Sequence, residues 1–120
     1  MKKHPTKGIT RLINALIWSL SGLKKALQNE TAFRQEIILF VLLAPLGYWL
    51  GGDKTEKCLL IGSLFLVLVV ELINSAIEST VDRISDEHHP LAGNAKDMGS
   101  AAVFLSLVNA VFIWATLLFL

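Results

Sequence analysis

One stretch decides the fold: Cys58-Leu-Leu-Ile-Gly-Ser-Leu-Phe-Leu-Val-Leu-Val-Val70, an apolar run that continues directly into Glu71, Asn74 and Glu78. In a helix that leaves the membrane interior, these three polar residues lie at i, i+3 and i+7 and so share one face. An ionisable group at membrane depth costs about 2.5 to 3.5 kcal/mol, so two carboxylates need a metal, a cation or a proton path. The face is predicted to be an active site; carboxylates paired with basic side chains in a helix bundle are the alternative.

Composition indicates an integral membrane protein. Of the 120 residues, 53% are hydrophobic, the mean hydropathy is +0.57, and the apolar residues form blocks too long for strands of a small soluble domain. A chain of this length supplies about three spans of roughly 20 residues, too few to enclose a polar site, so a homo-oligomer is expected. The single cysteine, Cys58, excludes an internal disulfide and a cysteine-based metal site. No nucleic-acid signature is present.

The N-terminal segment is predicted to be an amphipathic helix over about residues 8–28. Its apolar positions from Ile9 to Leu27 follow the helical period, with polar and basic residues such as Lys24 and Lys25 between them. Basic side chains, and Trp18 near the middle, suit a helix in the membrane interface. Charged flanks without a small-residue cleavage site argue against a signal peptide. An ordinary bundle helix is the alternative, because amphipathicity serves both uses.

The rest of the chain is predicted to form three membrane spans, which gives an all-α fold. The spans cover about residues 33–50, 57–77 and 98–119. Gly51 and Gly52 end the first span, and a short charged loop over 53–57 follows it. The whole chain, residues 1–120, is expected to be one membrane domain.

The second helix is expected to be longer than the hydrocarbon core is thick. It runs to about Ile84, roughly 40 Å at 1.5 Å per residue, so its last turns project into water. Residues 85–95 are predicted to form a polar loop that contains two histidines and Pro90. Asn94 and Asp97 are then expected to cap the third span.

The distribution of positive charge predicts a cytoplasmic N-terminus. Basic residues gather before the first span: Lys2, Lys3, Lys7, Arg11, Lys24 and Lys25. The loop after that span holds only Lys54 and Lys57, which Asp53 and Glu56 offset. Three spans then place the second loop inside and the C-terminus outside. The Glu71 face therefore opens to the cytoplasm, where nucleotides are.

Polar side chains on the predicted cytoplasmic side suit phosphoryl transfer. They are Glu30, Arg34, Gln35, Glu36, Glu71, Asn74, Glu78, Asp82, Lys96, Asp97 and Ser100. In Mg²⁺-dependent phosphoryl transfer, carboxylates hold the ion, the ion bridges phosphate oxygens and a base takes the acceptor's proton. The motifs of P-loop proteins and of protein kinases are absent from the sequence. Spacing alone therefore leaves ion or proton transport as an equal alternative.

Two longer motifs resemble the prokaryotic diacylglycerol kinase family. They are Glu71-Leu-Ile-Asn-Ser-Ala-Ile-Glu78 with Val81-Asp82-Arg83-Ile84, and Ala95-Lys96-Asp97-Met98-Gly99-Ser100-Ala101-Ala102-Val103. Asn29-Glu30 and Ala32-Phe33-Arg34-Gln35-Glu36 match the same family, and the resemblance covers nearly the whole chain. It implies a homotrimeric lipid kinase of the bacterial cytoplasmic membrane that makes phosphatidic acid from diacylglycerol and ATP. Each active site would lie at a subunit contact.

The resemblance also implies roles for single residues. Glu71 resembles the base that deprotonates the lipid hydroxyl, Glu30 and Glu78 the ligands that bring in Mg²⁺ with ATP, and Lys96 a group that neutralises phosphate charge. The implied nucleotide-binding residues are Arg11, Trp18, Glu30, Glu78, Glu87, His88, His89, Lys96 and Asp97. The implied lipid-binding residues are Arg11, Ala32, Phe33, Arg34, Gln35, Glu36, Glu71, Asn74 and Ser100.

Several of these residues also have simpler explanations. His88 and Trp18 stand where an enzyme of this family can carry tyrosine, and a solvated loop accounts equally well for the histidines. Asp97 suits a helix cap, and Asn74 suits a hydrogen bond between helices. Trp114 is expected to be an anchor in the outer membrane interface.

Two other functions stay open at this point. An undecaprenol kinase of the same fold would share the phosphate-transfer residues and differ in the acceptor pocket. A small cation or proton transporter would use Glu71 and Glu78 as its relay and would need neither a nucleotide nor Lys96. ATP turnover in the presence of lipid separates the two classes.

Overall fold

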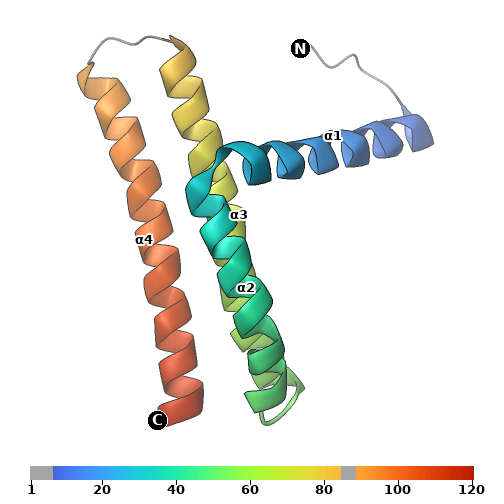
Figure 1. Cartoon of the computed structure of the whole chain (residues 1–120), viewed down its shortest axis with the longest axis vertical. Coiled ribbons are helices and arrows are strands. Elements are labelled where there is room, and N and C mark those ends of the chain that lie inside the picture. The colour runs from blue at the N-terminus through green and yellow to red at the C-terminus, as the bar shows by residue number, and fades with distance from the viewer. Residues whose placement is uncertain (1–6, 85–88) are drawn as a thin grey trace.

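Three long helices stand side by side, and a fourth leaves them at a steep angle (Figure 1). The structure is a computed structural model that describes residues 7–84 and 89–120. Over those residues it contains α1 (Gly8–Asn29), α2 (Thr31–Leu50), α3 (Lys54–Ile84) and α4 (Pro90–Phe119). By length and composition, α2, α3 and α4 can each cross a membrane. The predicted all-α fold with three spans is therefore confirmed.

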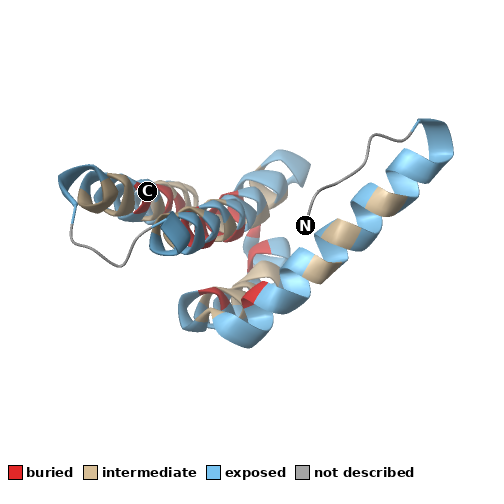
Figure 2. Cartoon of the chain, turned by 90° about the horizontal axis from the view of Figure 1, so that it is seen from above, coloured by how far each residue is buried: buried red, intermediate tan, exposed pale blue. Residues whose placement is uncertain are grey.

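The central helix of the bundle is α3. In its most apolar window 39% of the residues are buried, against 11% in the windows of α2 and α4. Figure 2 shows buried residues gathered inside the bundle, with mostly exposed surface facing outward. The exposed side chains there are largely apolar, as a surface in contact with lipid requires. Four polar residues of α3 are buried as well: Ser63, Glu71, Asn74 and Ser75.

A small apolar cluster stabilises the junction between α1 and α2. We call this junction, which consists of the single residue Glu30, the elbow. Ala26 of α1, Phe33 of α2 and Leu68 of α3 are buried together there. Phe33 is 1% exposed, so its ring is fully enclosed by this contact. Three helices thus meet beside Glu30, which is held close to the site described below.

The turn between α2 and α3 is shorter than predicted, because α3 begins at Lys54. Asp53 Oδ1 accepts a hydrogen bond from the Glu56 N–H at 2.8 Å, and Glu56 Oε2 accepts one from the Gly52 N–H at 2.8 Å. This nearly reciprocal arrangement satisfies N–H groups that a helix start leaves without partners. Of the charged residues assigned to a loop, Lys54, Glu56 and Lys57 therefore belong to the first turn of α3, and Asp53 directly precedes it.

The start of α4 also differs from the prediction. His89 precedes the helix and its Nδ1 accepts a hydrogen bond from the Leu91 N–H at 3.0 Å. Pro90 takes the first helical position, where its missing N–H costs nothing. Asn94 and Asp97 consequently lie inside α4, and the prediction that they cap it is wrong.

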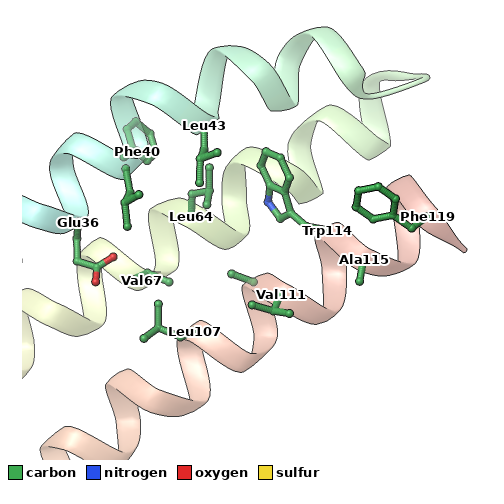
Figure 3. A pocket seen from close by; sticks show the side chains of 12 residues that line it. Glu36, Phe40, Leu43, Leu64, Val67, Leu107, Val111, Trp114, Ala115 and Phe119 are labelled. Atoms are coloured by element: carbon green, nitrogen blue, oxygen red, sulfur yellow. The ribbon is translucent and has the colours of Figure 1, made fainter.

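The three spans are tied together near one end by Trp114. Its Nε1 donates a hydrogen bond to the backbone carbonyl of Leu60 at 3.1 Å, so the indole points into the bundle (Figure 3). A Cβ on Gly47 of α2 would lie 3.2 Å from both the Leu60 Cβ and the Trp114 ring. Trp114 of α4 therefore bonds to α3 and packs next to α2. The sequence predicted only an anchor in the membrane interface and not this contact between helices.

Candidate active site

A cavity of about 310 Å³ gathers acidic side chains from three parts of the chain. Its lining residues are Glu30, Ala32, Glu36, Glu71, Asn74, Ser75, Glu78, Ser100 and Val103. We call it the acidic cavity. Glu30 comes from the elbow, Glu36 from α2, and Glu71 and Glu78 from α3. Apart from Ser75 and Val103, all of these residues were among those that the resemblance implied.

Glu71 is the most enclosed carboxylate of the acidic cavity, with 5% of its surface exposed. Asn74, one turn further along α3, is 8% exposed. Its Nδ2 donates a hydrogen bond to Glu78 Oε1 at 3.2 Å, the contact expected of residues four apart on one helix face. Helix geometry therefore accounts for the shared face of Glu71, Asn74 and Glu78.

The donor set fits a magnesium ion that arrives with a substrate. Within residues 7–84 and 89–120, no group of three or more His, Cys, Asp and Glu side chains is arranged to hold a metal. Mg²⁺, however, is often bound by one or two carboxylates together with substrate phosphates and water. Glu30 and Glu78 line the same cavity and supply two such carboxylates.

Lys96 of α4 forms an ion pair with Asp82 of α3, with 2.6 Å between Nζ and Oδ1. Both side chains are well exposed, at 44% and 63%, and exposed ion pairs contribute little to stability. Neither residue lines the acidic cavity. Asp82 was among the polar side chains expected on the cytoplasmic side, but it was given no individual role, although its position four residues after Glu78 places it on the same side of α3.

Arg34 does not line the acidic cavity but bonds the end of α1 to the start of α2. Arg34 Nη1 donates hydrogen bonds to the backbone carbonyls of Leu27 and Gln28, each at 3.0 Å, and Nη2 to Thr31 Oγ1 at 3.1 Å. These carbonyls end α1 and have no partner within the helix. Gln35 is exposed on α2. Of the five residues from 32 to 36, Ala32 and Glu36 line the acidic cavity, and the other three do not.

Two predicted nucleotide contacts, Arg11 and Trp18, do not line the acidic cavity of their own chain. Arg11 is exposed on α1, about 27 Å along the helix axis from Asn29 at 1.5 Å per residue. Trp18 is half-buried on the same helix. Figure 1 shows α1 running away from the bundle toward its N-terminal end. One chain therefore does not bring Arg11 to the acidic cavity.

Four of the implied nucleotide-binding residues lie in or near the connection between α3 and α4. Glu87 and His88 lie outside the described residues. His89 is exposed before α4, where it caps the helix, and Asp97 is exposed within α4.

A second cavity, of about 360 Å³, lies between α2, α3 and α4 and shares the lining residue Glu36 with the acidic cavity. Figure 3 shows Glu36 at one end of this second cavity. We call it the apolar groove. Its lining residues are Glu36, Leu39, Phe40, Leu43, Leu64, Val67, Leu107, Ala110, Val111, Trp114, Ala115 and Phe119. Among these, Glu36 is the one charged side chain. The sequence reasoning missed the groove, although the spacing of Leu107, Val111 and Ala115 by four residues marks one helix face.

A third hollow, of about 940 Å³, lies between α1 and α3. We call it the α1 groove. It is lined by Ser19, Gly22, Leu23, Lys25, Ala26, Asn29, Glu30, Phe65, Val69, Leu72, Ser75, Ala76 and Ser79. Glu30 and Ser75 line the acidic cavity as well, so the two spaces adjoin.

Comparisons with known proteins agree with these features. Residues 17–118 match the family model described as prokaryotic diacylglycerol kinase. The diacylglycerol kinase of Haemophilus influenzae is 50% identical over 116 residues, which cover 97% of this chain and 98% of that protein. The diacylglycerol kinase of Escherichia coli K12 is 50% identical over 113 residues, 94% of this chain and 93% of that protein. That of Pseudomonas aeruginosa is 49% identical over 121 residues, with 98% of each chain covered.

Proposed function

Because this chain belongs to the prokaryotic diacylglycerol kinase family, we propose that it is a membrane enzyme that transfers the γ-phosphoryl group of ATP to diacylglycerol. The observation that carries the proposal is that Glu36 lines both the acidic cavity and the apolar groove. A lipid whose acyl chain lies in the groove presents its hydroxyl group to the carboxylates. A substrate with one apolar part and one reacting polar end fits this pair of cavities.

In the proposed reaction, Glu71 accepts the proton of the lipid hydroxyl. The hydroxyl oxygen forms a bond to the γ-phosphorus, the bond from that phosphorus to the β–γ bridging oxygen breaks, and ADP and phosphatidic acid result. The low exposure of Glu71 supports its role as the base, because an enclosed site limits transfer of the phosphoryl group to water.

Glu30 and Glu78 are proposed to hold Mg²⁺, which neutralises phosphate charge when it is bound with ATP. Their shared cavity supports this role. Lys96 is proposed to exchange Asp82 for a phosphate oxygen. The exposure of the Lys96–Asp82 pair supports the exchange, because breaking a solvated ion pair costs little.

We place the protein in the bacterial inner membrane, with its N-terminus in the cytoplasm and α1 on the membrane surface. The excess of basic residues before α2 supports this orientation. The angle of α1 to the bundle and the exposure of its apolar residues, such as Ile9 at 71% and Leu12 at 66%, support the surface position.

A homotrimer with shared active sites is proposed for the assembly. Arg11 lies about 27 Å along α1 from Asn29 and so is far from the acidic cavity of its own chain, yet the resemblance implies that it contacts the nucleotide. The α1 groove next to Glu30 supports the same assembly, since it leaves space beside the cavity for a neighbouring chain. Closed cyclic symmetry would supply each site with parts of two chains.

Phosphate transfer by the purified protein in mixed micelles tests the function. Radiolabelled ATP is supplied with Mg²⁺ and with diacylglycerol, undecaprenol or ceramide in separate reactions. Label is expected in phosphatidic acid, at a higher rate than in the other two products. Faster labelling of undecaprenol would reassign the acceptor, and no lipid-dependent use of ATP would refute a kinase.

A further inference from the structure

Gly99 of α4 is buried against α3 at the position of Asn74. A Cβ built on Gly99 would overlap Asn74 Oδ1 and lie 3.3 Å from Asn74 Cγ. Asn74 Oδ1 is buried and has no hydrogen-bond partner in the part of the chain that the structure describes. The amide oxygen of Asn74 therefore packs directly on a stretch of α4 that carries no side chain.

The Asn74 amide presents its nitrogen, and not its oxygen, to Glu78. The Nδ2 group donates to Glu78 Oε1 at 3.2 Å. With the amide reversed, Asn74 Oδ1 would face a carboxylate oxygen, and two acceptors have no proton to share. The Cα–H groups of glycine can approach an amide oxygen closely at a helix–helix contact, so the oxygen tolerates the position next to Gly99.

We propose that Gly99 is a positioning residue for phosphoryl transfer. Its missing side chain leaves room for Asn74, and Asn74 orients the Glu78 carboxylate in the acidic cavity. Through this contact α4 controls the direction of a carboxylate on α3. The inference rests on the proposed role of Glu78 as a metal ligand.

Substitution of Gly99 by alanine tests the inference. The added methyl group overlaps the Asn74 amide, so Gly99→Ala is expected to release Glu78 from its hydrogen bond. Loss of a partner that orients a metal ligand typically lowers metal affinity about 10- to 100-fold. The Mg²⁺ concentration for half-maximal activity and the KM for MgATP should rise by that factor, with the KM for diacylglycerol unchanged.

Gly93→Ala is the matched control. Gly93 lies in the same helix, and nothing is within 4 Å of a Cβ built there. This variant should keep the wild-type dependence on Mg²⁺. Gly99→Ala with the same dependence as Gly93→Ala would overturn the inference.

Asn74→Ala separates positioning from folding, because it removes the amide without an overlap. It should raise the Mg²⁺ requirement as Gly99→Ala does, and Gly99→Ala added to it should have no further effect. A further loss in the double variant would show that the methyl group acts on the backbone of α3, which contradicts the inference. Asn74→Ala with a wild-type Mg²⁺ requirement would contradict it as well, even if Gly99→Ala does not fold. The wild-type reaction with diacylglycerol, measured in parallel, tests the proposed function separately.

Discussion

Arg34 Nη1 donates a hydrogen bond to the backbone carbonyl of Leu27 at 3.0 Å and so joins the start of α2 to the end of α1. The same nitrogen also bonds the Gln28 carbonyl at 3.0 Å. A planar guanidinium reaches several acceptors at once, which a lysine ammonium on its flexible stem does not reproduce. Arg34 therefore helps to fix the angle between α1 and the bundle.

Arg34→Lys is expected to loosen the last turn of α1. Loss of these charge-assisted hydrogen bonds should speed local amide exchange there about tenfold. Turnover should fall because α1 is less well held, with the KM for lipid unchanged. Hydrogen exchange and steady-state kinetics measure the two effects. A raised KM for lipid with wild-type exchange would instead make Arg34 a lipid contact.

Glu71→Gln is expected to lower turnover about 10² to 10⁴-fold and to leave nucleotide binding intact. A positioned general base contributes roughly that factor to the rate and is not needed for binding. Single-turnover phosphate transfer and equilibrium binding of an ATP analogue measure the two quantities. Near wild-type turnover of a folded Glu71→Gln protein at saturating substrates would remove Glu71 from the base role.

We expect Glu30→Gln and Glu78→Gln to weaken the binding of MgATP more than the binding of lipid. Each replaces a charged oxygen ligand of a hard cation by a neutral one, so higher Mg²⁺ should partly restore activity. Glu56→Gln is the matched control, because Glu56 lies at the opposite end of α3 and glutamine can still accept from Gly52. Losses in both variants that no Mg²⁺ concentration relieves would indicate a structural role.

Mixed oligomers test the shared site. Arg11→Ala and Glu71→Gln, refolded together, should regain a fraction of activity that varies with their ratio, because one intact site can draw on two chains. Glu71→Gln mixed with Glu78→Gln should regain none, because both changes are in α3. Zero recovery in the first mixture, with mixed oligomers confirmed by crosslinking, would argue against a shared site.

Trp114→Phe is expected to lower thermal stability. It removes the hydrogen bond to Leu60 O, worth about 0.5 to 1.5 kcal/mol. Gly47→Ala should also destabilise the protein, since its Cβ would lie 3.2 Å from the Trp114 ring, and should do so less in the Trp114→Phe background. Thermal unfolding in detergent measures both. Additive effects would show that the two residues are independent.

Local patterns predicted much of the fold and the centre of the site. The apolar runs give the spans, and the helical period alone places Glu71, Asn74 and Glu78 on one face. Pro90 was a signal for the start of α4, since proline suits the first helical position, but it was interpreted as part of a loop.

Contacts between helices could not be predicted in the same way. The Lys96–Asp82 pair, and the contact of Gly99 with Asn74, depend on the separation and rotation of α3 and α4. Neither quantity is encoded in the period of one helix. The hydrogen bonds of Arg34 could not be predicted either. Its partners are backbone carbonyls of α1, and every residue has a backbone carbonyl, so the residue types give no signal for this contact.

The short turn between α2 and α3 has a consequence for membrane insertion. Residues 51–53 alone separate the two helices, and the side chains of Glu56 and Asp53 accept hydrogen bonds from the N–H groups of Gly52 and Glu56 respectively. Lys57 also donates to the carbonyl of Tyr48 at the end of α2. A backbone group without a partner costs several kcal/mol in hydrocarbon, so a turn that satisfies its own groups lowers the barrier to translocation. The two helices are thereby suited to enter the bilayer as one hairpin during biosynthesis, with little polar chain to carry across.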